Sequence, residues 1–395
     1  MRDKPLCPGF KAAGISAGIK KDGAKDLGLI VSETPAAVTG VFTKNRIQAA
    51  PVQLDRERVQ SGQCHAIIVN SGNANCCTGA QGMADAREMT AMVAQSLGIS
   101  KESVLVASTG VIGEPMPMAV VRGAIPELVS ALSLDGIMDC AVAIMTTDTV
   151  PKTISRSGEL DGRVFNVTGM VKGAGMIRPD MATMLSFIMT DASVPAGFLK
   201  QALGRAVDRS FNRASIDGDT STNDTVLLMA NGVSGANIAA PAHESAFQKV
   251  LDEVCHELAK AMVRDGEGVT KFIEIMVKGA QSDGDAFRIV DTVAHSPLVK
   301  TAFFGEDANW GRLIMAVGRA GSELDPDKID IFFDQVRMVK DGMGCGPEAE
   351  AQATAVLKKP DMTITIDLNI GDGQASMITC DFSVDYVRIN ADYRS

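Results

Sequence analysis

Aromatic residues are scarce in this chain of 395 residues: they make up 4% of it, with one Trp and two Tyr. Its core therefore has to be filled by aliphatic side chains and by the 21 methionines. Basic residues are also in the minority, because 38 Lys and Arg stand against 48 Asp and Glu and give a net charge of −10. A nucleic-acid surface needs a basic stripe, so this charge balance argues against a nucleic-acid partner.

Metal-ligand patterns and long apolar runs are missing as well. The chain has four histidines, and none of its eight cysteines stands in C-x-x-C spacing, so no metal site is expected. No run reaches the length of a membrane span, and the N-terminus lacks the apolar segment of a secretory signal. Free thiols then suit a reducing cytoplasm, where we expect the protein to reside.

The apolar pattern predicts an α/β (α+β) fold. A length of 395 residues is too much for one core, so two or three domains are expected. Apolar runs at 66–70, 103–107 and 184–189 read as buried strands, and helical spacing marks 81–97, 196–209 and 243–263. The tail alternates at 362–368, 375–381 and 384–389, which predicts mostly antiparallel sheet.

A threonine stands where a Gly- and Pro-containing loop runs into one of these strands. The loop begins at Lys172 and ends in Ala182-Thr183, and the apolar segment starts at Met184. A threonine hydroxyl is a poor nucleophile without a base, and its own α-amino group becomes one if the chain is cut before it. On the local pattern alone, the favoured interpretation of Thr183 is a β-branched residue at a strand edge.

Thr109 and Gly110 follow another predicted strand. A glycine N–H and a neighbouring hydroxyl are the donors that an oxyanion hole needs, although an ordinary strand-to-loop turn has the same pattern. Conventional bases are few, because the histidines lie in apolar or helical contexts without an evident nucleophile beside them. These are His65, His243, His256 and His295.

Two further patterns lack the context that their chemistry requires. Residues 14–18 match G-x-S-x-G, but the residues before them do not read as the apolar strand of a nucleophile elbow. Residues 216–225 hold three Asp without the distal Glu of an EF-hand. We interpret that segment as a polar loop, held by side-chain-to-backbone hydrogen bonds, near a polar site.

The stretch from Lys172 to Leu185 resembles the cleavage-site signature of the glutamate N-acetyltransferase family, also called ornithine acetyltransferases, of arginine biosynthesis. Further motifs of that family follow in the same order over nearly the whole chain. They lie at 69–75, 108–113, 217–224, 266–271, 296–302, 309–312 and 386–393.

The resemblance implies a layered sandwich similar to the DmpA-like N-terminal-nucleophile fold, with a smaller C-terminal α+β domain at about 280–395. It also implies self-cleavage between Ala182 and Thr183. The products would be an α chain of residues 1–182 and a β chain of residues 183–395, assembled as an α2β2 heterotetramer.

The implied activity is transfer of an acetyl group from N2-acetyl-L-ornithine to L-glutamate. Thr183 would carry the acetyl group in a ping-pong mechanism, and Thr109 and Gly110 would stabilise the oxyanion. No cofactor is implied, and acetyl-CoA is a candidate co-substrate. Two other classes stay open: a related aminopeptidase or amidase, and a non-catalytic small-molecule binding protein.

The same resemblance implies a set of substrate contacts. They are Thr149, Lys172, Thr183, Glu267, Asn390 and Ser395. Ser395 stands where relatives often end in Thr, and Asp180 stands where many have Asn. Val269 replaces a smaller residue. These departures concern the range of donors and acceptors more than the chemistry.

Overall fold

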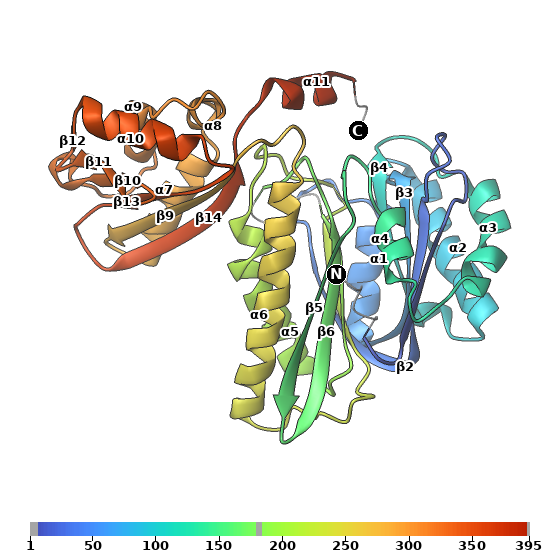
Figure 1. Ribbon diagram of the computed structural model, residues 1–395. Helices are drawn as coiled ribbons and strands as arrows, with labels where there is room; N and C mark the ends of the chain where they lie inside the picture. Colours follow the sequence, from blue (N-terminus) through green and yellow to red (C-terminus); the bar gives the residue numbers. More distant parts are fainter. Residues whose placement is uncertain (1–6, 179–183, 393–395) are drawn as a thin grey trace. The chain divides into compact units, whose positions relative to one another are not determined.

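The computed structural model describes residues 7–178 and 184–392, which form two compact units (Figure 1). The larger unit holds the described residues up to Asn212 together with Asp219–Met262. The smaller unit holds Arg213–Gly218 and the described residues from Val263 onward. Both contain helices and sheet, so the prediction of a mixed α/β fold is confirmed.

The larger unit is built on an 8-stranded sheet with the order β4-β3-β2-β8-β7-β6-β5, in which β1 pairs with β2. Its strands are β1 (Phe10–Ile15), β2 (Leu27–Phe42), β3 (Gln63–Asn73), β4 (Val104–Val111), β5 (Lys152–Leu160), β6 (Arg163–Lys172), β7 (Leu185–Thr190) and β8 (Thr225–Ala230). The β3–β4 and β7–β8 pairs are parallel, and the other pairs are antiparallel.

Helices cover this sheet and bury its apolar side chains. They are α1 (Ala50–Arg58), α2 (Gly79–Leu97), α3 (Met118–Ser130), α4 (Ile137–Ala143), α5 (Ala196–Arg209) and α6 (Pro241–Arg264). In β3, Ile67 and Val69 belong to the cluster that includes α4 residues, whereas Ala66 and Ile68 belong to the cluster with α2 and α3. A strand buried on both faces carries an unbroken apolar run, which is why the sequence predicted it.

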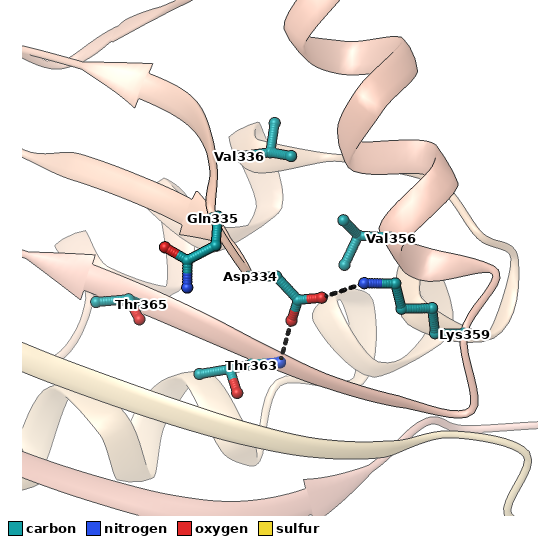
Figure 2. A pocket seen from close by; sticks show the side chains of 7 residues that line it. All are labelled: Asp334, Gln335, Val336, Val356, Lys359, Thr363 and Thr365. Atoms are coloured by element: carbon teal, nitrogen blue, oxygen red, sulfur yellow. Dashed lines mark hydrogen bonds and ion pairs between the residues drawn. The ribbon is translucent and has the colours of Figure 1, made fainter.

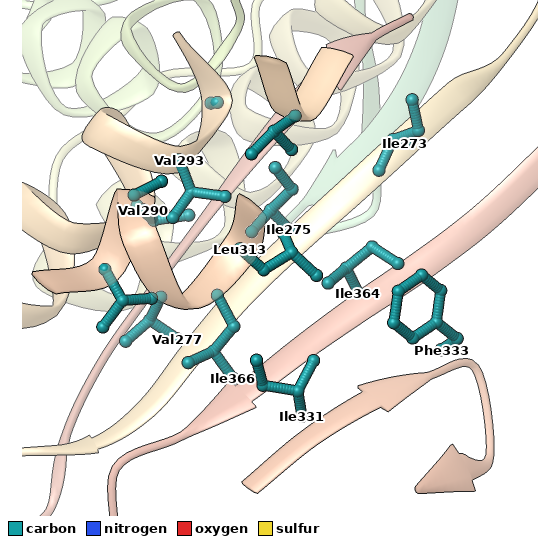
Figure 3. Close-up of a cluster of buried hydrophobic side chains, with 14 of the residues drawn as sticks. Ile273, Ile275, Val277, Val290, Val293, Leu313, Ile331, Phe333, Ile364 and Ile366 are labelled. Atoms are coloured by element: carbon teal, nitrogen blue, oxygen red, sulfur yellow. The ribbon is translucent and has the colours of Figure 1, made fainter. Parts of the chain in front are cut away.

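The smaller unit has a 6-stranded sheet with the order β12-β11-β10-β13-β9-β14. Its strands are β9 (Phe272–Ala280), β10 (Asp330–Phe333), β11 (Val336–Lys340), β12 (Met343–Gly344), β13 (Asp361–Asp367) and β14 (Gly373–Cys380), and its helices are α7 (Asp283–Ala294), α8 (Pro297–Phe304), α9 (Trp310–Gly318), α10 (Pro347–Leu357) and α11 (Val384–Asp392). Figure 3 shows its core, where Ile275, Val277 and Ile364 of the sheet lie near Val290 and Leu313 of the helices.

The tail is mostly antiparallel sheet, as predicted, because β13 pairs antiparallel with β10 and β14 pairs antiparallel with β9, while β13 runs parallel to β9. The prediction is wrong for one segment. Residues 384–389 are not a strand but most of helix α11. The Ser383 hydroxyl accepts the Tyr386 N–H at 3.1 Å, as an N-cap residue does, and Val384 and Val387 are exposed. The β-branched residues suggested a strand, but no sheet face buries them here.

Within the described residues, none of the helices combines the length and the apolar composition that crossing a membrane requires.

Candidate functional site

The expected cleavage junction lies between β6 and β7 of the larger unit. These strands pair antiparallel, with Lys172 opposite Leu185, and the segment that joins them contains residues 179–183. Ala182 and Thr183 therefore lie outside the described residues, and so does Ser395 at the chain end. Met184 is buried, and its N–H donates to Asp224 Oδ1 at 2.8 Å. Asp224 thus fixes the backbone immediately after the junction.

Thr109 and Gly110 lie near the end of β4, where the strand pairs with β3. Gly110 stands opposite Gly72 and has a φ of +131°. A Cβ on Gly110 would come within 2.4 Å of the Gly72 carbonyl carbon. Both the dihedral angle and the close approach of β3 therefore require glycine at this position. Thr109 beside it is buried.

The Lys172 ammonium brings two threonine hydroxyls together. Its Nζ donates to Thr146 Oγ1 at 2.7 Å and makes a longer contact of 3.4 Å with Thr109 Oγ1. Lys172 is only 3% exposed, so its charge acts in a largely water-free environment, where electrostatic interactions are stronger than in bulk water. The structure therefore places two of the predicted site residues, Lys172 and Thr109, in one buried cluster.

Asp148 supplies the counter-charge of this cluster. Its Oδ1 accepts from Lys152 Nζ and from the Gly173 N–H, both at 2.7 Å, and its Oδ2 accepts the Thr146 N–H at 3.0 Å. Burial alone would raise the pKa of Asp148, but Lys172, Lys152 and these hydrogen bonds outweigh it and lower the pKa to about 2. Asp148 is therefore a carboxylate at neutral pH.

The part of the acidic loop that belongs to the larger unit, from Asp219 to Thr225, packs against the same strand ends. Asn223 Nδ2 donates to Ala74 O at 2.6 Å and to Ser108 O at 2.8 Å, and Thr43 Oγ1 donates to Ser221 O at 2.7 Å. These contacts confirm the interpretation of a polar loop held by side-chain-to-backbone bonds. Burial raises the pKa of Asp224 well above its ordinary value, although the Met184 N–H and Lys172 act against it.

Two other predicted substrate contacts meet in the smaller unit. Asn390 of α11 donates from Nδ2 to Glu267 Oε2 at 2.7 Å and to Tyr386 O at 3.0 Å. Glu267 is buried, so the amide of Asn390 fixes the orientation of a carboxylate with little solvent around it. Thr149 belongs to the larger unit, where it is exposed and follows Asp148 in the chain.

The sequence did not single out Asp148, Thr146, Lys152 or Lys20. Lys20 Nζ donates to Met145 O at 2.7 Å and to Lys25 O at 3.0 Å. Burial lowers its pKa, and so does the neighbouring Lys172 charge, while Asp26 acts in the other direction. The one available signal was the position of Asp148 beside Thr149. Nothing in the sequence linked residue 20 to residue 172.

A separate hollow of the smaller unit lies beside the turn between β10 and β11 (Figure 2). The Asp334 carboxylate in this hollow forms an ion pair with Lys359, whose Nζ donates to it at 2.6 Å, and it also accepts the Thr363 N–H at 2.9 Å. Of the predicted site residues that the structure describes, none lines it.

Comparisons with known proteins find relatives that match nearly the whole chain. The model of the ArgJ family matches residues 11–395. The arginine biosynthesis bifunctional protein ArgJ of Geobacter sulfurreducens is 54% identical over 389 residues, covering 98% of this chain and 99% of the relative. The protein of the same name from Syntrophotalea carbinolica is 52% identical, with the same coverage.

A solved structure is also similar. The crystal structure of the arginine biosynthesis bifunctional protein ArgJ from Bacillus halodurans has a TM-score of 0.51 and 43% identity, covering 53% of this chain and 100% of that one.

Together with the α/β fold and the buried Lys172 cluster, these matches define the class of the protein: it is an acyltransferase. More specifically, the chain belongs to the ArgJ family.

Proposed function

We propose that this protein transfers the acetyl group of N2-acetyl-L-ornithine to L-glutamate, giving ornithine and N-acetylglutamate for arginine biosynthesis, after cutting itself between Ala182 and Thr183. The observation that carries the proposal is the buried Lys172–Thr109 cluster at the base of the junction, in a chain that matches the ArgJ family from residue 11 to residue 395.

Self-cleavage comes first in this scheme. The Thr183 hydroxyl attacks the Ala182 carbonyl, the acyl group moves from nitrogen to oxygen, and water hydrolyses the resulting ester. Three backbone features support it: Asp224 fixes Met184, Asp148 accepts the Gly173 N–H, and Gly173 has a φ of +153° that favours glycine. The segment is therefore held at both ends.

The length of the solved relative is a further support. The whole Bacillus halodurans chain corresponds to 53% of this one, and residues 183–395 are likewise slightly more than half of the chain. A precursor that is cut near its middle gives chains of that length.

Acetyl transfer then follows ping-pong logic. The new α-amine of Thr183 has an ordinary pKa of about 7.7–8.0, so it accepts the hydroxyl proton near neutral pH. Thr183 takes the acetyl group, ornithine leaves, and the glutamate amine removes the acetyl group again. Thr109 and the Gly110 N–H stabilise the oxyanion, where a single donor contributes about 2.7–4 kcal/mol.

The remaining predicted contacts bind the charged ends of the amino-acid substrates. Lys172 offers a positive charge and Glu267 a negative one, and Asn390 orients Glu267. Thr149 and Ser395 add hydroxyl groups. The cleavage products assemble as α2β2, which sedimentation of the purified protein tests through its mass.

A second acetyl donor belongs to the same proposal. The curated relatives are called bifunctional proteins, which supports acetyl-CoA as a co-substrate for glutamate acetylation. An assay with acetyl-CoA, glutamate and no acetylornithine tests this activity. If no N-acetylglutamate forms, acetyl-CoA is not a donor for this protein, and the proposal keeps N2-acetylornithine alone.

The decisive experiment joins a gel with a turnover assay. The wild type should give two bands, residues 1–182 and 183–395, while Thr183→Ala stays as one inactive chain and Thr183→Ser keeps a hydroxyl and is cut. A fully active, uncut Thr183→Ala protein would contradict the proposal.

The rival function is hydrolysis by a related aminopeptidase or amidase. A transferase releases ornithine from N2-acetylornithine continuously only when glutamate is present. Sustained ornithine release without glutamate would identify a hydrolase instead.

A further inference from the structure

The loop between β3 and α2 carries two adjacent thiols that the proposed reaction does not use. Of the eight cysteines, Cys77 and Cys345 are exposed and the other six are buried. Cys76 Sγ and Cys77 Sγ lie 3.8 Å apart. The loop thus presents one accessible thiol with a second, hidden thiol in contact with it.

This sulfur–sulfur distance suits two bonds to one shared atom. Two bonds of about 2.3 Å from sulfur to one central atom, the length of a zinc–sulfur bond, place the sulfurs roughly 3.8 Å apart when the angle between the bonds is tetrahedral. A pyramidal central atom has a smaller bond angle and places the two sulfurs somewhat closer together. By contrast, a disulfide usually joins residues whose Cα atoms are at least about 4.4 Å apart. Neighbouring Cα atoms lie about 3.8 Å apart across a trans peptide, so a Cys76–Cys77 disulfide is strained.

We propose that Cys76 and Cys77 form a chelating dithiol site for trivalent arsenic that carries one organic group. In such a compound, R–As=O, two thiols can replace the oxygen on arsenic, and the loop presents two thiols. Each sulfur forms one bond to arsenic, and the oxygen leaves as water with both thiol protons. No electrons are transferred, so the step needs no oxidant or reductant.

The two thiols take unequal parts in this reaction. Cys77 is accessible and forms the first bond. Cys76 has no exposed surface and belongs to a core cluster of the larger unit, so the second bond draws it out of its packing. Burial also raises the pKa of the Cys76 thiol, which makes the second bond the slower one.

Chelation also disturbs the backbone that supports Thr109 and Gly110. The Gly113 N–H donates to Cys76 O at 2.9 Å, and the Ala74 N–H donates to Val111 O at 3.0 Å. These bonds connect the thiol loop to the end of β4. Withdrawal of Cys76 from the core therefore displaces the strand that carries the oxyanion pair. This consequence rests on the proposed function, whereas arsenic binding itself does not.

Phenylarsine oxide tests the site on the purified, reduced wild-type protein. Intact-mass spectrometry should find one phenylarsenic group on the chain that contains Cys76 and Cys77, bound with loss of one water. The adduct should survive excess glutathione, a monothiol, and be removed by 2,3-dimercaptopropanol, a dithiol. The wild-type adduct should also be accompanied by loss of acetyl transfer.

Three variants locate the adduct. Cys77→Ser and Cys76→Ala should each lower the glutathione-resistant adduct at least about tenfold, because chelation is lost. Cys345→Ser, which removes the other exposed thiol, should leave it unchanged. Since Cys77 is exposed, Cys77→Ser folds even if Cys76→Ala does not.

Three results would overturn the site: an adduct that persists in Cys77→Ser, an adduct confined to Cys345, or a Cys76–Cys77 disulfide that forms in air and blocks the reagent. Retained acetyl transfer in a fully modified protein would overturn only the coupling to β4. A protein that binds the reagent but never transfers acetyl groups would contradict the proposed function and leave the dithiol site standing.

Discussion

At the scale of single residues, Asp148 shows how the site keeps a buried carboxylate ionised. Its pKa falls from an ordinary 3.8 to about 2 in the folded state. A group with a lowered folded pKa stabilises the fold above its unfolded pKa and loses that contribution as the pH falls through the folded value. The contribution of Asp148 is therefore complete above about pH 4 and disappears toward pH 2.

Asp148→Asn should accordingly lower the free energy of unfolding by about 2 kcal/mol at pH 7. At pH 3 the free energies of unfolding of the wild type and the variant should differ by roughly 1 kcal/mol less, because part of the stabilisation by ionised Asp148 is lost from the wild type at that pH. Urea unfolding at the two pH values measures it, with the exposed Asp372→Asn as control. An equal loss at both pH values would mean that position 148 acts through packing rather than charge.

Lys172 gives the second prediction at this scale. Lys172→Met keeps the length of the side chain but removes the ammonium group from Thr109 and Thr146. If that charge stabilises the reacting centre, kcat/KM for acetyl transfer should fall about 10²–10³-fold.

The matched control for Lys172 is Lys340→Met, which removes a lysine that is 60% exposed in its side chain and should change nothing measurable. Unchanged turnover in Lys172→Met would remove Lys172 from the mechanism. A fall in kcat/KM that merely follows a loss of folded protein, measured by thermal unfolding, would make its role structural.

At the scale of elements, the close approach of β3 and β4 is the feature to test. Gly110→Ala would place a Cβ within 2.4 Å of the Gly72 carbonyl carbon, at a φ of +131°. Gly113→Ala also has a positive φ, +84°, but its Cβ would meet nothing within 4 Å. The pair therefore separates the steric clash from backbone strain alone.

Gly113→Ala should lose about 1–2 kcal/mol of stability and keep its activity. Gly110→Ala should lose about 3 kcal/mol or more together with acetyl transfer. Denaturant unfolding and a turnover assay measure both variants. Equal effects of the two substitutions would show that the β3–β4 contact is not what position 110 requires.

The same scale explains which elements could be predicted from the sequence. Residues 66–69 form an apolar run because β3 is buried on both faces, and burial of that kind leaves a local signal. The prediction for residues 384–389 was wrong, because their β-branched side chains suggested a strand. The sequence feature that indicates a helix there is Ser383, which caps its N-terminus. The Lys172–Asp148 cluster left no local signal, since it depends on how distant strand ends and loops meet.

At the scale of the whole molecule, the strand order determines what the proposed self-cleavage would do to the larger unit. In the order β4-β3-β2-β8-β7-β6-β5, only β7 and β8 come from residues 183–395. β7 pairs with β6 from Val167↔Thr190 to Lys172↔Leu185, and β8 pairs with β2 from Ala37↔Ala230 to Phe42↔Thr225. The two strands therefore lie between strands of residues 1–182, and neither of the proposed products could leave without breaking two strand interfaces.

We expect the cut products to stay together until this sheet unfolds. With an affinity tag on the N-terminus, native capture should retain residues 1–182 and 183–395 in equal amounts, whereas capture in concentrated guanidinium should retain only the tagged piece. Thr183→Ala should be captured whole in both buffers and serves as the control. If residues 183–395 wash away under native conditions while the tagged piece stays folded, the interleaved sheet is not what joins the two products.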